Sequence, residues 1–96
     1  MRDAVDATRR EIKELSEYRA LTLGYVSLLK DRYSRGLLYY EKFLYFPCAA
    51  AARNGDLQEL KALQAKNFPW NHLTCANAAE HGHLEVLKWA RENGCP

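Results

Sequence analysis

The segment from Cys48 to Pro96 repeats itself, and this repetition constrains the fold more than any other feature of the sequence. A shift of 27 residues aligns its first part with its second without gaps. Nine aligned pairs are then identical: Cys48/Cys75, Ala49/Ala76, Ala51/Ala78, Ala52/Ala79, Gly55/Gly82, Leu57/Leu84, Leu60/Leu87, Lys61/Lys88 and Pro69/Pro96. A fixed period of roughly 20 to 50 residues is typical of proteins built from stacked structural units. The sequence therefore predicts a repeat protein.

The first copy has the pattern of two helices joined by a tight turn. Pro47 suits the first turn of a helix, where its missing N–H is tolerated, and we expect a short helix over residues 48–53. Gly55 supplies the turn. Asp56 is a good N-cap for a longer helix over residues 57–66, whose leucines share one face.

The second copy repeats this pattern. We expect a loop at residues 71–72, a short helix over residues 74–81, a turn at Gly82, and a longer helix over residues 84–92. The inward-facing residues of that last helix are predicted to be Leu84, Leu87 and Ala90. The alanines shared by both short helices would let neighbouring helices approach closely, so the units should bury their apolar faces by stacking.

Residues 1–46 do not follow the repeat and are predicted to form a separate helical region. Apolar residues recur there at steps of three, four and seven, which predicts one long helix over about residues 3–33, weakened or bent at Gly24. A shorter helix, rich in aromatic residues, is expected over residues 37–46. Because repeat arrays need a cover over their apolar ends, we expect this region to cap the repeats.

Residues 73–88 read Leu-Thr-Cys-Ala-Asn-Ala-Ala-Glu-His-Gly-His-Leu-Glu-Val-Leu-Lys. This stretch resembles the ankyrin repeat, whose hallmark is Thr-Pro-Leu-His-x-Ala-Ala, two further residues, and Gly-His-Leu-Glu-Val-Val-Lys. The first copy puts Pro47 at the hallmark proline and keeps Ala51, Ala52, Gly55 and Leu57. The resemblance covers residues 46–96. It implies an all-α solenoid with two helix–turn–helix repeats, 47–73 and 74–96, capped by the N-terminal helices.

The two copies depart from the usual ankyrin pattern. Their period is 27 residues rather than about 33, and the residues that would form a projecting hairpin finger are missing between Asn67 and Leu73. The loop at residues 68–71 and the Cys95-Pro96 end resemble instead a variant subfamily with compact loops. Glu59 replaces a usual apolar residue, which suits an atypical, more terminal repeat.

Two repeats are fewer than the three or so usually needed for stability, and the outer face of the second copy would be uncovered. We therefore expect that the N-terminal helices stand in for a repeat and that the chain is a fragment of a longer array. Self-association through the open end of the second repeat is a further alternative.

The resemblance implies a non-enzymatic module or scaffold that binds a protein partner, with no small-molecule substrate. Partners of ankyrin arrays usually lie along the short helices and loops. The positions that map to this side are Ala50, Arg53, Asn71, His72, Asn77 and Glu80.

Two other functions compete with this one. The amphipathic helix from Val5 to Leu29 could drive coiled-coil assembly, so that the chain has a structural role. Nucleic-acid binding is disfavoured because the net charge is only +2, whereas a strong footprint would show as a clustered basic face. The residues that such binding would use are Arg32, Arg35, Tyr39 and Tyr40.

No residue pattern predicts an enzyme, a cofactor or a metal site. The histidines and cysteines near the second copy lack metal-ligand spacing; they are His72, Cys75, His81, His83 and Cys95. Cys48 lies beside alanines, as Cys75 does, which favours packed thiols in a reducing compartment. The N-terminus has no apolar signal segment, and no run approaches the roughly 18 apolar residues of a membrane span. We expect an intracellular, cytoplasmic protein without a membrane partner.

Overall fold

The chain folds from short helices separated by tight turns. The computed structural model describes residues 17–96, of which 71% are helical and none lies in a strand. The prediction of an all-α class is therefore confirmed. Residues 17–23 are helical. The elements that follow are α2 (Val26–Ser34), the 3-10 helix η1 (Glu41–Tyr45), α3 (Phe46–Asn54), α4 (Leu57–Ala65), α5 (His72–Glu80) and α6 (Leu84–Glu92).

The long helix predicted over residues 3–33 is interrupted at Gly24. Gly24 has a φ of +73°, and α2 begins two residues later. The N–H of Tyr25 donates to the carbonyl of Ala20 at 2.8 Å, which closes the preceding helix. The prediction was wrong here because a glycine with positive φ ends a helix rather than bending it. The part of the prediction over residues 1–16 lies outside the described residues.

A turn of one form joins consecutive helices at Gly24, Gly55 and Gly82, and in each case the next helix begins two residues after the glycine. Gly24, Gly55 and Gly82 have φ values of +73°, +72° and +71°. In each turn the residue after the glycine donates its N–H to the carbonyl five residues earlier: Tyr25 to Ala20 at 2.8 Å, Asp56 to Ala51 at 3.0 Å and His83 to Ala78 at 2.8 Å. The turns at Gly55 and Gly82 were predicted from the sequence, whereas the turn at Gly24 was not.

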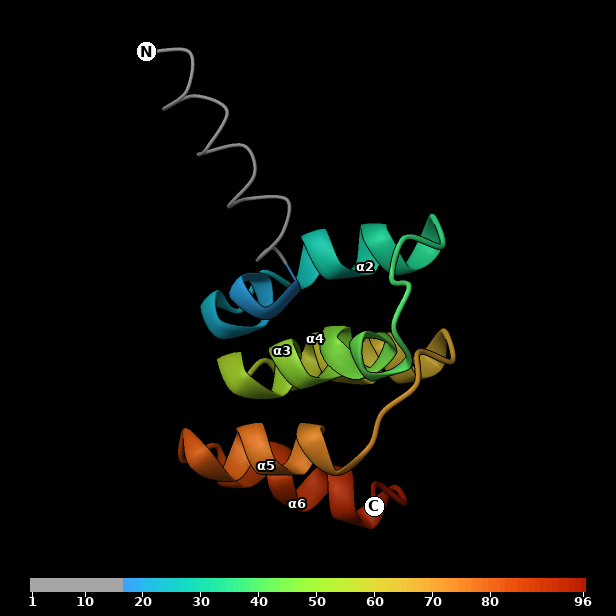
Figure 1. Cartoon of the computed structure of the whole chain (residues 1–96). Coiled ribbons are helices and arrows are strands. Elements are labelled where there is room, and N and C mark those ends of the chain that lie inside the picture. The colour runs from blue at the N-terminus through green and yellow to red at the C-terminus, as the bar shows by residue number, and fades with distance from the viewer. Residues whose placement is uncertain (1–16) are drawn as a thin grey trace, which may run out of the picture.

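Three helix–turn–helix units lie one above another in Figure 1: residues 17–34, then α3 with α4, then α5 with α6. The short helix α3 is central, because it packs against α2, α4, α5 and η1. Its residues 48–52 have no exposed surface. The alanines among them leave room for helices on both sides, which explains why the sequence uses small residues there.

Side chains cap two of these helices. The Oδ1 atom of Asp56 accepts the N–H of Glu59 at 3.0 Å, so the predicted N-cap of α4 is confirmed. Asn71 caps α5 in a similar way, since its Oδ1 accepts the N–H of Leu73 at 2.9 Å. Because of this cap, α5 begins at His72, two residues before the predicted start.

The single helix predicted over residues 37–46 does not form. Gly36, with a φ of +70°, ends the turn after α2, and residues 37–40 are not helical. A 3-10 helix, η1, follows, and α3 begins at Phe46. Aromatic side chains lose rotamer freedom in a helix, and here the segment has to connect two layers while it buries Phe43 and Phe46. These two needs favour an irregular connection over one regular helix.

The inner face of α6 differs from the prediction. Leu84 is 70% exposed, whereas Val86 and Ala90 are buried and Leu87 is half-buried. The prediction for Leu84 was wrong because helical periodicity gives the spacing of a stripe but not which side is covered.

Candidate interaction surface

Two of the six residues predicted to face a partner are buried. Ala50 has no exposed surface. Asn77 is 8% exposed, and its Nδ2 donates to the carbonyl of Leu73 at 2.8 Å. Both residues belong to the interior, so they offer no surface for recognition.

Two more of the six hold the fold together. Asn71 caps α5, and its carbonyl accepts the Sγ–H of Cys95 at 3.3 Å. The carbonyl oxygen of Arg53 lies 2.9 Å from Nε2 of His83. Because a carbonyl only accepts, this nitrogen carries the ring proton and donates a hydrogen bond to it. Arg53 is half-buried. The Asn71 contacts lie within the third unit, whereas the Arg53 contact, made by its backbone carbonyl, joins the second unit to the third.

The remaining two, His72 and Glu80, are exposed and lie on one side of α5. Residues four, seven and eight apart share a helix face, which places Ala76 and Ala79 between them. These alanines are also exposed. We name this set (His72, Ala76, Ala79 and Glu80) the terminal face. Ala76 and Ala79 were not among the predicted residues, although the sequence shows that each is identical to its equivalent in the first copy, Ala49 and Ala52.

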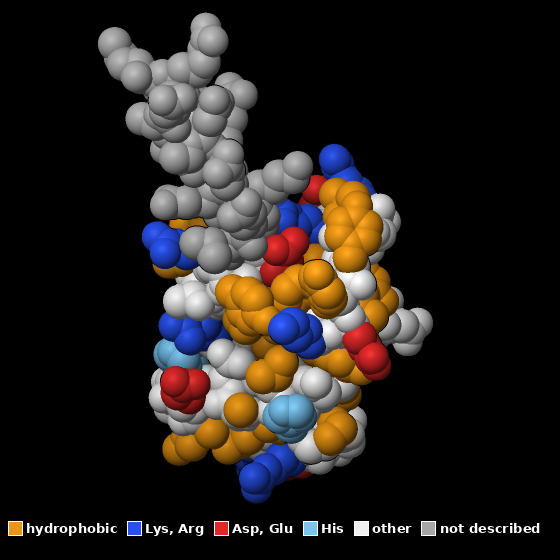
Figure 2. All heavy atoms as spheres, viewed as in Figure 1, with side chains coloured by type: hydrophobic (Ala, Val, Ile, Leu, Met, Phe, Trp, Pro, Cys, Tyr) orange, Lys and Arg blue, Asp and Glu red, His pale blue; other side chains and the backbone are white. Residues whose placement is uncertain are grey.

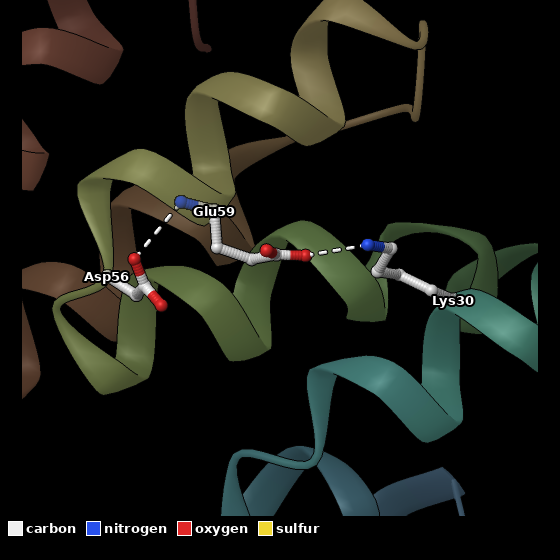
Figure 3. Close-up of polar contacts among 3 residues, drawn as sticks. All are labelled: Lys30, Asp56 and Glu59. Atoms are coloured by element: carbon white, nitrogen blue, oxygen red, sulfur yellow. Dashed lines mark hydrogen bonds and ion pairs between the residues drawn. The ribbon is translucent and has the colours of Figure 1, made fainter.

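Polar side chains join successive units. The Nδ2 of Asn54 donates to the carbonyl of Gly24 at 2.7 Å, and His83 bonds the turn of the second unit as described above. In Figure 3, Glu59 of α4 points toward Lys30 of α2, and their charged atoms are 2.9 Å apart. Glu59 therefore makes an ion pair with the neighbouring unit.

An aromatic cluster joins the first helical unit to η1 and the start of α3. The ring centroids of Tyr18 and Phe43 are 5.2 Å apart at 88°, and those of Phe43 and Phe46 are 5.2 Å apart. Lys42 places its Nζ 5.2 Å from the Tyr18 ring. A hollow of about 500 Å³ lies beside these rings, and Tyr40 lines it with 65% of its surface exposed. Edge-to-face packing of Tyr18 on the buried Phe43 and Phe46 stabilises the contact between these segments.

The residues considered for nucleic-acid binding do not form a basic site. Arg32 pairs with Glu17 at 3.0 Å, and Arg35 pairs with Asp31 at 3.1 Å. Tyr39 and Tyr40 remain exposed. On the face drawn in Figure 2, Lys and Arg side chains are scattered rather than gathered into one patch. The arrangement lacks the clustered charge that phosphate binding uses.

All three cysteines are free thiols. Burial raises the pKa of Cys48 to about 11, although Gln64 opposes this with a hydrogen bond to the sulfur. Burial, with a smaller contribution from Cys75, raises the pKa of Cys95 to about 12. A thiol with a raised pKa is a poor nucleophile at neutral pH because the thiolate is the reactive form.

His81 and His83 flank Gly82 in the third turn. The His81 and His83 rings are parallel within 11°, with centroids 6.5 Å apart, and Nδ1 of His81 lies 3.1 Å from the carbonyl of Asn77. Over residues 17–96, no three His, Cys, Asp or Glu side chains are grouped as a metal ion would require. In the same range, no helix combines the length and apolar character needed to cross a bilayer.

Comparison of the chain with protein-family models, curated proteins and solved structures found no match.

Proposed function

We propose that this chain is a non-enzymatic protein-interaction module, built as an ankyrin-like solenoid of stacked helix–turn–helix units. The observation that carries the proposal is that one form of glycine turn, with matching hydrogen bonds, joins two helices at Gly24, at Gly55 and at Gly82. Hydrogen bonds between successive units, from Asn54 and His83, support it. In such stacks each unit contacts only its neighbours, and rigid surfaces result.

The N-terminal helices act as the first unit of this stack. The turn at Gly24 lies 31 residues before that at Gly55, and the same shift aligns Ala20 with Ala51, Leu29 with Leu60 and Lys30 with Lys61. Three units reach the number that repeat proteins usually need for stability. This arrangement supports the expectation that the N-terminal region stands in for a repeat.

Recognition would occur on the terminal face, since His72 and Glu80 are the exposed members of the original set. The mechanism is binding of a protein partner to a preformed surface without chemistry. The raised pKa values of the two buried thiols argue against a nucleophilic role for them. Three free thiols accord with a reducing, cytoplasmic location.

Coiled-coil assembly through residues from Val5 to Leu29 is less well supported. The turn at Gly24 divides this segment. Beyond the turn, Val26 and Leu29 are buried, and α2 packs on α3. Apolar residues already used inside the stack are not available to a second helix.

Site-specific photocrosslinking tests the proposed function. A benzophenone amino acid replaces His72 or Glu80 in the full chain, and Gln58 on the exposed side of α4 serves as the control position. Irradiation in cells should give the same protein adduct from positions 72 and 80 and none from position 58. Excess unmodified chain should reduce the adduct. Equal labelling from all three positions, or no adduct from the terminal face, would contradict the proposal.

A further inference from the structure

Equivalent positions of α3 and α5 differ in exposure. Ala49 and Ala52 of α3 have no exposed surface, whereas Ala76 and Ala79, 27 residues later on α5, are exposed. The helix α3 lies between α2 and α5, while α5 packs mainly against α3 and α6 within the described residues. The terminal face therefore corresponds to the side of α3 that the next unit covers.

The residues at the two ends of α3 and α5 show the same difference in exposure. Tyr45 and Arg53, the equivalents of His72 and Glu80, are half-buried, whereas His72 and Glu80 are exposed. On the second helix of each unit, Val26 is 9% exposed, Leu57 is half-buried and Leu84 is 70% exposed. Exposure thus rises at matched positions toward the third unit.

The turn glycines carry the clearest contrast. A methyl group added at Gly24 would overlap the Asn54 side chain, and one added at Gly55 would lie 2.5 Å from the His83 ring. Both side chains come from the following unit and donate a hydrogen bond to the turn they cover. At Gly82 nothing lies within 4 Å of the same point.

We propose that the terminal face docks a further helix–turn–helix unit of the same design. Its first helix would place small residues against Ala76 and Ala79, because only small side chains permit the close helix approach seen at Ala49 and Ala52. Its turn would present an Asn or His over Gly82 that donates to a carbonyl of the third turn, as Asn54 and His83 do at the two existing interfaces. The inference rests on the proposed function and names the kind of partner that fits this surface.

The probe is a second copy of residues 70–96 joined directly after Pro96. Pro96 is the equivalent of Pro69, so this junction keeps the 27-residue spacing. If the added unit docks, its helices will form, and the far-ultraviolet circular dichroism of the chain will increase. We expect the urea midpoint of unfolding to rise by about 1 M, because interfaces between neighbours supply much of the stability of stacked units.

A substitution on the terminal face provides the matched control. Ala79→Arg, made only at the original residue of the extended chain, should abolish the rise, because arginine prevents close approach. The same substitution in the 96-residue chain should leave the midpoint unchanged, since Ala79 is exposed. Ala62→Arg, at an exposed position of α4, should leave the rise intact.

Three outcomes overturn the inference. The added copy stays unfolded, or the rise survives Ala79→Arg, or the 96-residue chain self-associates in sedimentation and Ala79→Arg disperses it, which would assign the face to a second copy. These readouts are independent of the photocrosslinking. Specific adducts from positions 72 and 80 without docking of the added unit would retain the proposed function and reject the helical partner.

Discussion

At the residue scale, the same glycine turn meets different surroundings. Gly55→Ala places its methyl group against the His83 ring, whereas Gly82→Ala meets nothing within 4 Å. Both pay the cost of positive φ, about 1 kcal/mol. We expect Gly55→Ala to lose roughly 2–3 kcal/mol in all, because the ring must move and its hydrogen bond to Arg53 is lost.

Urea unfolding of the two glycine variants measures this difference. The Gly82→Ala variant is the matched control, since its φ of +71° is nearly that of Gly55, +72°. Equal losses of stability would show that the His83 contact contributes nothing to the interface.

Thr74 places a hydroxyl group in the interior of the protein. Its side chain has no exposed surface, and its Oγ1 has no hydrogen-bond partner among the described residues. Because valine has the same shape without the polar group, Thr74→Val should be neutral or stabilise the protein by up to about 1 kcal/mol. Thermal unfolding would measure the change, with Thr74→Ser as the control that keeps the hydroxyl. A loss above 1 kcal/mol would mean that the hydroxyl has a partner.

The cysteines should differ in reactivity. With a pKa of about 11, Cys48 has about one thiolate in a thousand at pH 8, and Cys95 has fewer, with a pKa of about 12. Cys75 is half-buried. Mass spectrometry after brief iodoacetamide treatment should therefore find Cys75 labelled first, and all three labelled alike in denaturant. Labelling of Cys48 before Cys75 would contradict the burial of its thiol.

The raised pKa of Cys48 also predicts a pH dependence of stability. Its thiol shifts from the ordinary value of 9.0 to about 11 on folding, so the unfolded chain loses this proton first. Stability should be unaffected below about pH 9 and should fall as pH rises between 9 and 11, by up to about 1.4 kcal/mol per pH unit. Cys48→Ala should show a shallower slope in urea titrations over this range.

At the scale of elements, α3 and α5 differ in how far neighbouring helices cover them. Ala49→Leu inserts bulk where α3 has no exposed surface, so overpacking should cost about 1–3 kcal/mol. Ala76→Leu, at the equivalent position of α5, is exposed and should change stability by no more than about 0.5 kcal/mol. Chemical denaturation of this matched pair tests whether α3 is the tightly packed helix.

The sequence predicted most of the elements in residues 47–96. Asp56, Gly55 and Gly82 act within a few residues of their position, so capping and turn formation could be read locally. The exposure of Leu84 could not be predicted in this way, because it depends on what lies beside the third unit. The prediction of one helix over residues 37–46 was wrong for a similar reason, because the path of this segment is set by the layers that it connects.

At the scale of the whole molecule, protection against hydrogen exchange should follow position in the stack. The helix α3 is covered by units on both sides, so its amides should exchange only on global unfolding. The amides of α6, which begins with the exposed Leu84, should exchange through local opening at lower free energy. Native-state exchange followed by NMR would check this order, and stronger protection of α6 than of α3 would contradict it.

The sequence by itself determined the helical class, the period of 27 residues and two of the three glycine turns. These features depend on backbone preferences and on residues close together in the chain. Tertiary structure alone decided that Gly24 ends a helix, and that identical alanines are buried in α3 and exposed in α5. The physical reason is that burial depends on which unit stacks against a surface, and the repeated sequence is the same whether or not a neighbour covers it.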